Sequence, residues 1–169
     1  WIKINEWGKS GTIPIIVTFG TQNFYYGIRN SINTTFVSYT NGTGSQQTVQ
    51  GTQLLSPGVW YNFVWTQKKF NETNVENIFY LNGLLDKNST FQNGANESNA
   101  SFGNAFRIGS FTATNSFFNG SIDEFAFWNR SLSAVEVANL YNLSYGTYYW
   151  KANTTDSIDD LNETNVMQF

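Results

Sequence analysis

The stretch of sequence that decides the fold covers residues 118–142 and reads FNGSIDEFAFWNRSLSAVEVANLYN. Its first part, residues 121–128, follows an Asn-Gly turn signal and predicts a β-strand. Ser133 and Glu136 come next at the spacing of a capping box, in which each side chain can bond the other residue's backbone N–H. The stretch therefore predicts a strand and then a short helix over residues 133–142.

Shorter strand-like segments separated by turn residues precede this stretch. They cover residues 1–4, 13–19, 24–29, 35–39, 46–49, 60–67, 77–81, 84–85 and 106–111. Asn82 and Gly83 predict a tight hairpin, because a type I′ turn needs positive φ at both central positions. Residues 86–104 are rich in Asn, Ser and Gly, which predicts a long surface loop. Many short strands and one helix predict an all-β fold of two antiparallel sheets packed face to face.

The character of the sequence changes near Ser144. We therefore expect a sandwich domain over residues 1–144 and a C-terminal extension over residues 145–169. The extension holds two strand candidates, residues 148–153 and 165–169, on either side of a polar, acidic stretch. The acidic residues of this stretch do not have the spacing of a calcium-binding EF-hand loop, so we interpret it as a solvated linker.

Composition excludes several classes of function. The net charge is −3 with no basic cluster, which argues against a nucleic-acid partner because binding phosphates needs Lys and Arg. The chain has no His and no Cys, so Ser-His catalysis, thiolate catalysis and Cys/His zinc sites are excluded. No apolar run reaches the roughly 18 residues of a membrane helix, so we expect no membrane insertion by this segment.

Sites for N-glycosylation are unusually dense. The chain holds 11 Asn-x-Ser/Thr triplets, more than twice the number expected if its 23 Asn, 15 Ser and 18 Thr residues were placed at random. This excess predicts a glycoprotein exposed outside the cell, with compositional bias of a polar β protein as the alternative explanation. The triplets begin at Asn33, Asn41, Asn71, Asn88, Asn96, Asn99, Asn119, Asn129, Asn142, Asn153 and Asn162.

Two motifs in this sequence carry a resemblance to a known family. Residues 120–124 read GSIDE, and residues 128–133 read WNRSLS before a short helix that contains Leu-Tyr. This combination resembles the end of the laminin-G-like domains of the concanavalin A-like lectin/glucanase superfamily. Weaker matches follow the family's order at residues 1–4, 58–64, 79–83 and 106–110, so the resemblance covers about residues 1–142.

The resemblance implies a jelly roll that lacks a strand. The family normally has one or two strands before the one that corresponds to residues 1–4, and the first of them pairs near the Ile-Asp-Glu strand. Without it, residues 121–128 would have an unpaired edge, with part of an apolar groove open beside them. We expect residues 145–169 to fill this place as a donated strand, either in their own chain or in a neighbouring copy. The alternative is that they begin a further domain.

Candidate site residues are few. Glycoside hydrolases of this superfamily need two carboxylates about 5–9.5 Å apart. Asp123 and Glu124 are adjacent and face opposite sides of a strand, so we expect no enzyme. No cofactor is required, and calcium is the metal that Asp123 could help to bind. Four aromatic residues near strand ends are candidates for stacking on a sugar ring, with packing in the core or on a sheet face as the alternative for each: Trp7, Phe24, Tyr25 and Tyr26.

These observations predict a non-catalytic recognition or adhesion module of a glycosylated extracellular or cell-surface protein. Its expected partner is a glycan or another cell-surface protein. The alternative is a structural subunit of an extracellular filament or surface coat, in which copies of the chain bind each other by strand donation from the C-terminal extension. A glycoside hydrolase is the third alternative.

Overall fold

The computed structural model describes the chain in several stretches. These are residues 1–7, 13–19, 24–29, 31–40, 44–69, 71, 74–91, 106–112 and 115–143, and the backbone of 149–150, 153–155, 161–163 and 167–168. The statements below concern these residues.

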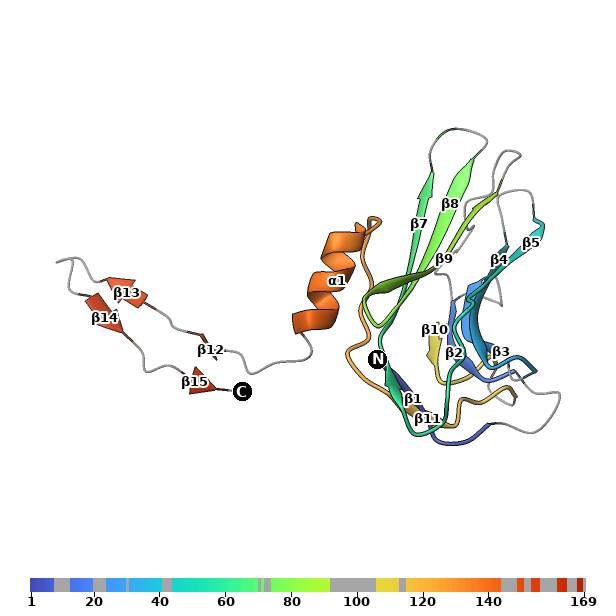
Figure 1. Cartoon of the computed structure of the whole chain (residues 1–169), viewed down its shortest axis with the longest axis horizontal. Helices are drawn as coiled ribbons and strands as arrows, with labels where there is room; N and C mark the ends of the chain where they lie inside the picture. Colours follow the sequence, from blue (N-terminus) through green and yellow to red (C-terminus); the bar gives the residue numbers. More distant parts are fainter. Residues whose placement is uncertain are drawn as a thin grey trace.

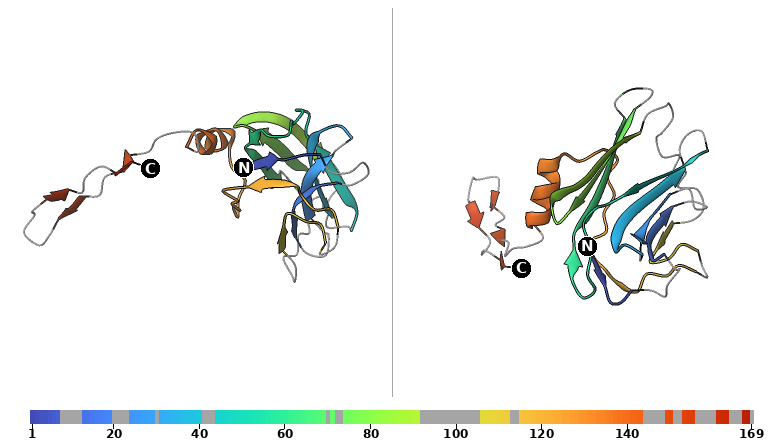
Figure 2. Two further views of the ribbon diagram at one scale, coloured as in Figure 1. Left: turned by 90° about the horizontal axis from the view of Figure 1, so that it is seen from below. Right: turned by 45° about the vertical axis from the view of Figure 1, so that its right-hand side comes forward.

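The described residues form a sandwich of two antiparallel sheets with one short helix on its outside (Figures 1 and 2). One layer has the strand order β10-β2-β3-β4-β5 and the other has the order β7-β8-β9. A small third sheet, β11-β1-β6, lies at the end of the sandwich where the N-terminus is. The bounds are β1 Ile2–Ile4, β2 Ile15–Phe19, β3 Phe24–Arg29, β4 Thr34–Thr40, β5 Gln46–Gln50, β6 Trp60–Tyr61, β7 Phe63–Lys69, β8 Val75–Leu81, β9 Leu84–Phe91, β10 Phe106–Ile108 and β11 Gly120–Ile122. The predicted all-β sandwich is confirmed.

The turn between β8 and β9 is the predicted Asn-Gly hairpin. Asn82 has a φ of 52° and Gly83 a φ of 74°, and Leu81 pairs with Leu84 across a two-residue loop. A side chain at position 83 would also collide with α1, because a Cβ there would lie 2.9 Å from the Cβ of Tyr141. The hairpin therefore needs glycine for its backbone conformation and for its contact with the helix.

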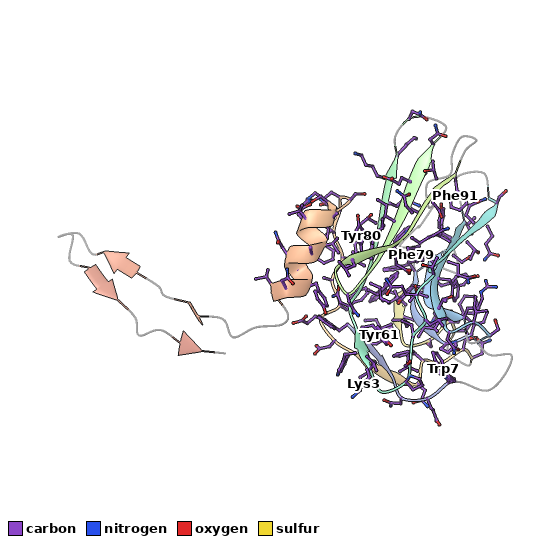
Figure 3. The ribbon with its side chains drawn as sticks, viewed as in Figure 1. Lys3, Trp7, Tyr61, Phe79, Tyr80 and Phe91 are labelled. Atoms are coloured by element: carbon purple, nitrogen blue, oxygen red, sulfur yellow. The ribbon has the colours of Figure 1, made fainter. Side chains whose placement is uncertain are left out.

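Aromatic rings fill the space between the two layers. Tyr26 of β3 stacks on Phe63 of β7, with ring centroids 4.1 Å apart, and Phe24 lies 5.0 Å from Trp65. Figure 3 shows Phe79 between the layers and Tyr80 on the helix side of the same strand, as the alternation of a β-strand requires. These pairs place β7 directly over β3.

A buried amide ties the two layers together. Asn77 of β8 is 0% exposed and donates from Nδ2 to the hydroxyl of Tyr39 on the opposite sheet, at 3.1 Å. Its Oδ1 accepts from Trp65 Nε1 at 3.2 Å and from Gln67 Nε2 at 3.1 Å. Burial raises the pKa of the Tyr39 hydroxyl, so the group stays neutral. Every hydrogen-bonding partner in this network is thus uncharged.

Helix α1, Ala134–Leu143, begins with the predicted capping box. Glu136 donates its N–H to Ser133 Oγ at 3.3 Å, and Ser133 donates its N–H to Glu136 Oε2 at 2.8 Å. Arg130 adds an ion pair to Glu136 at 2.6 Å. A hydrophobic staple also forms, because Leu132 and Val137 are both buried against Tyr80. These contacts hold α1 on the outer face of the β7-β8-β9 sheet.

Three segments differ from the sequence prediction. The strand predicted over 121–128 ends at Ile122, because β1 stops pairing with it there and Glu124 takes a φ of 48°. The polar residues 86–91, predicted as loop, belong to β9, since pairing with β8 overrides their low strand propensity. The strand predicted over 106–111 ends at Ile108, where Gly109 has a φ of 83°.

The C-terminal extension contains four short strands that pair with each other. β12, Tyr149–Trp150, pairs with β15, Met167–Gln168, and β13, Asn153–Thr155, pairs with β14, Leu161–Glu163. The polar stretch predicted as a linker therefore includes parts of two strands. In Figures 1 and 2 these strands lie beyond α1, apart from the sandwich.

The cap of α1 predicts a pH-dependent stability. Hydrogen bonds from Arg130 and Ser133 lower the pKa of Glu136 from 4.5 to about 2. Because the folded-state pKa is lowered, the stabilisation is present above pH 4.5 and is lost as the pH falls toward 2. We expect Glu136→Gln to lower the Tm at neutral pH, and the difference from the natural chain to vanish near pH 2.

Thermal unfolding followed by circular dichroism at a series of pH values measures this difference. Val135→Gln is the matched control, because Val135 lies on the same helix and is 68% exposed. A constant difference between the Glu136→Gln variant and the natural chain at all pH values would contradict the assignment.

Candidate functional site

A groove of about 720 Å³ opens between the two layers of the sandwich. Its floor includes Ile16, Val17 and Phe19 of β2, the strand next to β3 in the five-stranded sheet. Because β7 lies over β3, the opposite layer has no strand over β2, and this leaves the groove. We call it the β7 groove.

One wall of the β7 groove is the backbone edge of β7. Asn82 donates its N–H to the carbonyl of Asn62 at 2.8 Å, so the backbone groups of Asn62 and of every second residue after it face β8. The backbone groups of Phe63 and Trp65 point the other way, into the groove. No described strand pairs with β7 on this side. The wall therefore offers backbone donors and acceptors to an extended chain.

The other wall is the irregular segment 123–131. Phe125 and Phe127 rest on the five-stranded sheet, with ring centroids 5.7 Å from Phe106 and 5.5 Å from Phe19. These contacts leave the two rings 44% and 59% exposed, and Trp128 is 40% exposed. A run of large apolar side chains this open to solvent is typical of a binding surface.

A side-chain contact joins the two walls at the far end of the groove. Ser131 donates its hydroxyl to the backbone carbonyl of Gln67, one of the β7 groups that face away from β8. Leu132 follows immediately and lines the groove, as do Leu140 and Leu143 of α1. The helix thus contributes apolar side chains along the outer side of the site.

Two residues that line the groove have buried polar atoms without a hydrogen-bond partner. They are Tyr26 Oη and Asn62 Oδ1. Burial, with a smaller effect from Asp86, raises the pKa of Tyr26 well above its usual value, so its hydroxyl remains a neutral donor. Buried polar groups in native proteins are normally paired. These two groups are exceptions to that rule.

The four aromatic residues predicted to bind a sugar do not form one site. Phe24 and Tyr26 are buried between the layers, in agreement with the alternative of core packing, and both line the floor of the β7 groove. Tyr25 faces the opposite side of the sheet, where its hydroxyl accepts from Gln46 Nε2 at 2.8 Å. Trp7 packs against the core. An alternating strand necessarily separates three consecutive aromatic residues in this way.

Asp123 lies at the near end of the groove with an exposed side chain. Its backbone pairs with Trp1, and its Oδ1 accepts from the backbone N–H of Glu124 at 2.8 Å. Within the described stretches, no three acidic side chains come together as metal ligands. The geometry therefore adds no support to the prediction that Asp123 helps to bind calcium.

The predicted glycosylation sites that the structure describes lie toward solvent. The Asn side chain is exposed at Asn71, Asn88, Asn119, Asn129 and Asn142, and half-buried at Asn33. Asn153 and Asn162 lie in β13 and β14, whereas Asn41, Asn96 and Asn99 fall outside the described residues. Glycosylation itself stays a prediction.

Comparison with protein-family models assigns this chain to a known superfamily. Residues 1–138 match the model described as concanavalin A-like lectin/glucanases superfamily, of the laminin-G type. The chain belongs to this superfamily. The resemblance found in the sequence motifs is thereby confirmed over nearly the same residues.

Two solved structures have a sandwich fold similar to that of this chain. The botulinum neurotoxin type G receptor binding domain is 15% identical with a TM-score of 0.53, over 90% of this chain and 42% of that one. The binding domain of Paraclostridial mosquitocidal protein 1 is 12% identical with a TM-score of 0.52, over 96% of this chain and 46% of that one. At these identities the likeness shows the fold alone, and this chain spans less than half of either relative.

Two further searches gave negative results. No curated protein sequence matched this member of the superfamily. None of the helices in the described stretches has the length and apolar character needed to cross a membrane.

The two walls of the groove should respond differently to substitution. Phe63→Ala should lower the free energy of unfolding by about 3–5 kcal/mol, because Phe63 stacks on Tyr26 within the core. Phe127→Ser should lower it by roughly 1 kcal/mol or less, because the ring is already 59% exposed. Urea unfolding followed by tryptophan fluorescence compares the two variants. Equal losses of several kcal/mol would contradict an open wall at residues 123–131.

Proposed function

We propose that this chain is a non-catalytic recognition module of an extracellular glycoprotein, and that it binds an extended polypeptide in the β7 groove. The observation that carries the proposal is the edge of β7 at Phe63 and Trp65, which pairs with no described strand and faces the exposed rings of Phe125, Phe127 and Trp128. An added strand would gain backbone hydrogen bonds from one wall and apolar contacts from the other. This is the mode in which sheet edges bind extended peptides.

Glycan binding is the second candidate. Exposed aromatic faces such as those of Phe127 and Trp128 suit the apolar side of a pyranose ring, and Asn129 and Arg130 stand beside them as partners for hydroxyls. The superfamily also takes its name from lectins. The long backbone edge of Phe63 and Trp65 has no role in this alternative, so we place it second.

The described carboxylates support a non-catalytic role. Glycoside hydrolysis needs two carboxyl groups that face one bond from opposite sides, about 5–9.5 Å apart. The two carboxylates at the groove, Asp123 and Glu124, are consecutive in sequence, and Asp123 Oδ1 already accepts from the backbone N–H of Glu124. We therefore assign the groove to binding.

One experiment tests the assignment of the groove. The natural chain is screened against immobilised heptapeptide libraries and against a glycan array, with and without calcium. We expect peptide binding that the Phe127→Ser/Trp128→Ser variant reduces at least tenfold. The matched control is Phe117→Ser, because Phe117 is similarly exposed, at 60%, but does not line the groove.

The outcomes of this screen are distinct. Groove-dependent binding to glycans alone selects the lectin alternative. Binding that the groove variant does not change, or no binding on either array, overturns the assignment.

A second experiment tests the extracellular glycoprotein assignment. Five triplets have exposed Asn side chains in turns, strands or a helix end, and an exposed Asn is accessible to glycosylation. We expect the intact mass of native material to fall on deglycosylation. Material made in bacteria is the control and should not change. An unchanged mass of native material would contradict the assignment.

A further inference from the structure

The direction of the strand that fits the β7 groove follows from β1. This strand pairs antiparallel with β11 on one side and with β6 on the other, so that Ile2 lies opposite both Ile122 and Tyr61. The two flanking chains continue in the same direction, one along residues 123–131 and the other along β7. They meet again where Ser131 bonds Gln67. The groove is therefore the place of one strand in line with β1 and antiparallel to both walls.

Trp1 marks the near end of this place. Its carbonyl accepts from Asp123 N–H at 3.0 Å, and its amino group donates to the Asp123 carbonyl at 2.7 Å. Continuing the register of β1 places five further residues opposite positions 63–67 of β7. At about 3.3 Å per residue this is a segment of roughly 17 Å. The occupant therefore needs about five extended residues that enter at Gln67 and end at Trp1.

The occupant must be uncharged and mostly apolar. Its inner side chains would meet the floor of Ile16, Val17 and Phe19, and its outer side chains would meet Leu140 and Leu143 of α1. A strand buried on both faces is typically a continuous apolar run rather than an alternating one. Charged residues in the middle of the occupant would remain without partners there.

The C-terminal segment of this chain has the required length and composition. Residues 165–169 read NVMQF, with three large apolar side chains and no charge. Part of this segment already takes extended geometry as β15, which pairs with β12 over only two residues. The segment is preceded by 21 residues, 144–164, which span up to about 70 Å when extended. It can therefore reach a groove well outside its own sandwich.

The entry point of the groove favours a neighbouring copy. α1 ends at Leu143, close to Trp1, because Tyr141 stacks on Trp1 with ring centroids 5.6 Å apart. A strand antiparallel to β7 must enter at the opposite end, near Gln67. In its own chain the extension would first have to run back along the whole groove. In Figures 1 and 2 its strands instead project beyond α1, away from the sandwich.

We propose that the β7 groove binds residues 165–169 of a second copy of the chain as an antiparallel strand, which rests on the proposed role of the groove as a polypeptide site. In the register of β1, Phe169 lies opposite Phe63, and Asn165 lies opposite Gln67. Each copy then gives a strand at one end and receives one at the other. Such a head-to-tail contact does not close on itself and builds a linear assembly.

Cysteine pairing tests this arrangement in the full chain. The natural sequence has no Cys, so introduced thiols have no competing partners. A mixture of the Gln67→Cys variant and the Asn165→Cys variant should form a disulfide-linked heterodimer under mild oxidation. Ser157→Cys replaces Asn165→Cys in the matched control, which should link at least tenfold less. Non-reducing electrophoresis and mass spectrometry of the linked peptides measure the result.

Two further arms identify the other outcomes. A double variant, Gln67→Cys/Asn165→Cys, that links within one chain at every concentration overturns the second copy and selects donation within the chain. No link in either arrangement overturns the proposal and leaves the groove to another strand, including any residues that precede Trp1 in a longer polypeptide. Tryptophan fluorescence of each variant checks that it remains folded.

A peptide competition avoids substitution in the groove altogether. A synthetic peptide of residues 160–169 is added in excess to the natural chain while sedimentation velocity follows assembly. We expect the assemblies to shorten, whereas a peptide with Met167→Lys and Phe169→Lys should have no effect. Assemblies unaffected by the natural peptide contradict the proposal. If both tests fail but the heptapeptide screen still shows groove-dependent binding, only the proposal of a second copy is wrong. If that binding is also absent, the proposed function is wrong as well.

Discussion

The sandwich depends on the antiparallel pairing of β1 with two neighbours at once. Three residues, from Ile2 to Ile4, join chain segments that are about 60 and 120 positions away in sequence. Because β1 is antiparallel to both β11 and β6, the chains that leave those strands must run in the same direction. Two such chains cannot pair with each other in an antiparallel sheet, so they remain one strand apart. The β7 groove is the direct result of this pairing.

The width of the groove is fixed by contacts elsewhere in the core. Stacking of Tyr26 on Phe63, together with the bond between Asn77 and Tyr39, holds β7 over β3. β7 therefore cannot move over β2 to close the gap without breaking both contacts. At the other wall, the capping box of α1 and the bond of Ser131 to β7 hold the end of the segment 123–131. The groove is thus built into a rigid frame.

Local signals in the sequence predicted the parts of the fold that depend on neighbouring residues. The Asn-Gly hairpin and the capping box appear in the structure as predicted, because each is decided by residues within a few positions of one another. The extent of strands was less predictable. The aromatic residues among 125–128 favour a strand, yet β11 ends at Ile122, whereas the mostly polar residues 86–91 join a strand because they pair with β8. Pairing between distant segments decides such cases.

The candidate site could be predicted only in part. An open place beside residues 121–128 was expected from the family resemblance, whereas the aromatic residues Trp7, Phe24, Tyr25 and Tyr26 were chosen by their position near strand ends. Position near a strand end does not tell which face a residue takes, and the alternation of β3 buries Phe24 and Tyr26 and turns Tyr25 outward. The edge of β7 at Phe63 and Trp65 was missed, because an unpaired backbone edge leaves no signature in side-chain composition.

The neutral bond network between the two layers has a consequence for the conditions that the fold tolerates. Asn77 and Tyr39 join the sheets through an amide and a phenol, and the indole of Trp65 bonds the same amide from within one sheet; none of these groups carries a charge at moderate pH. Dissolved ions screen charged pairs strongly but act little on a buried neutral bond. The hydrogen bonds that join the layers are therefore largely insensitive to screening, and they keep their strength in both fresh and saline media.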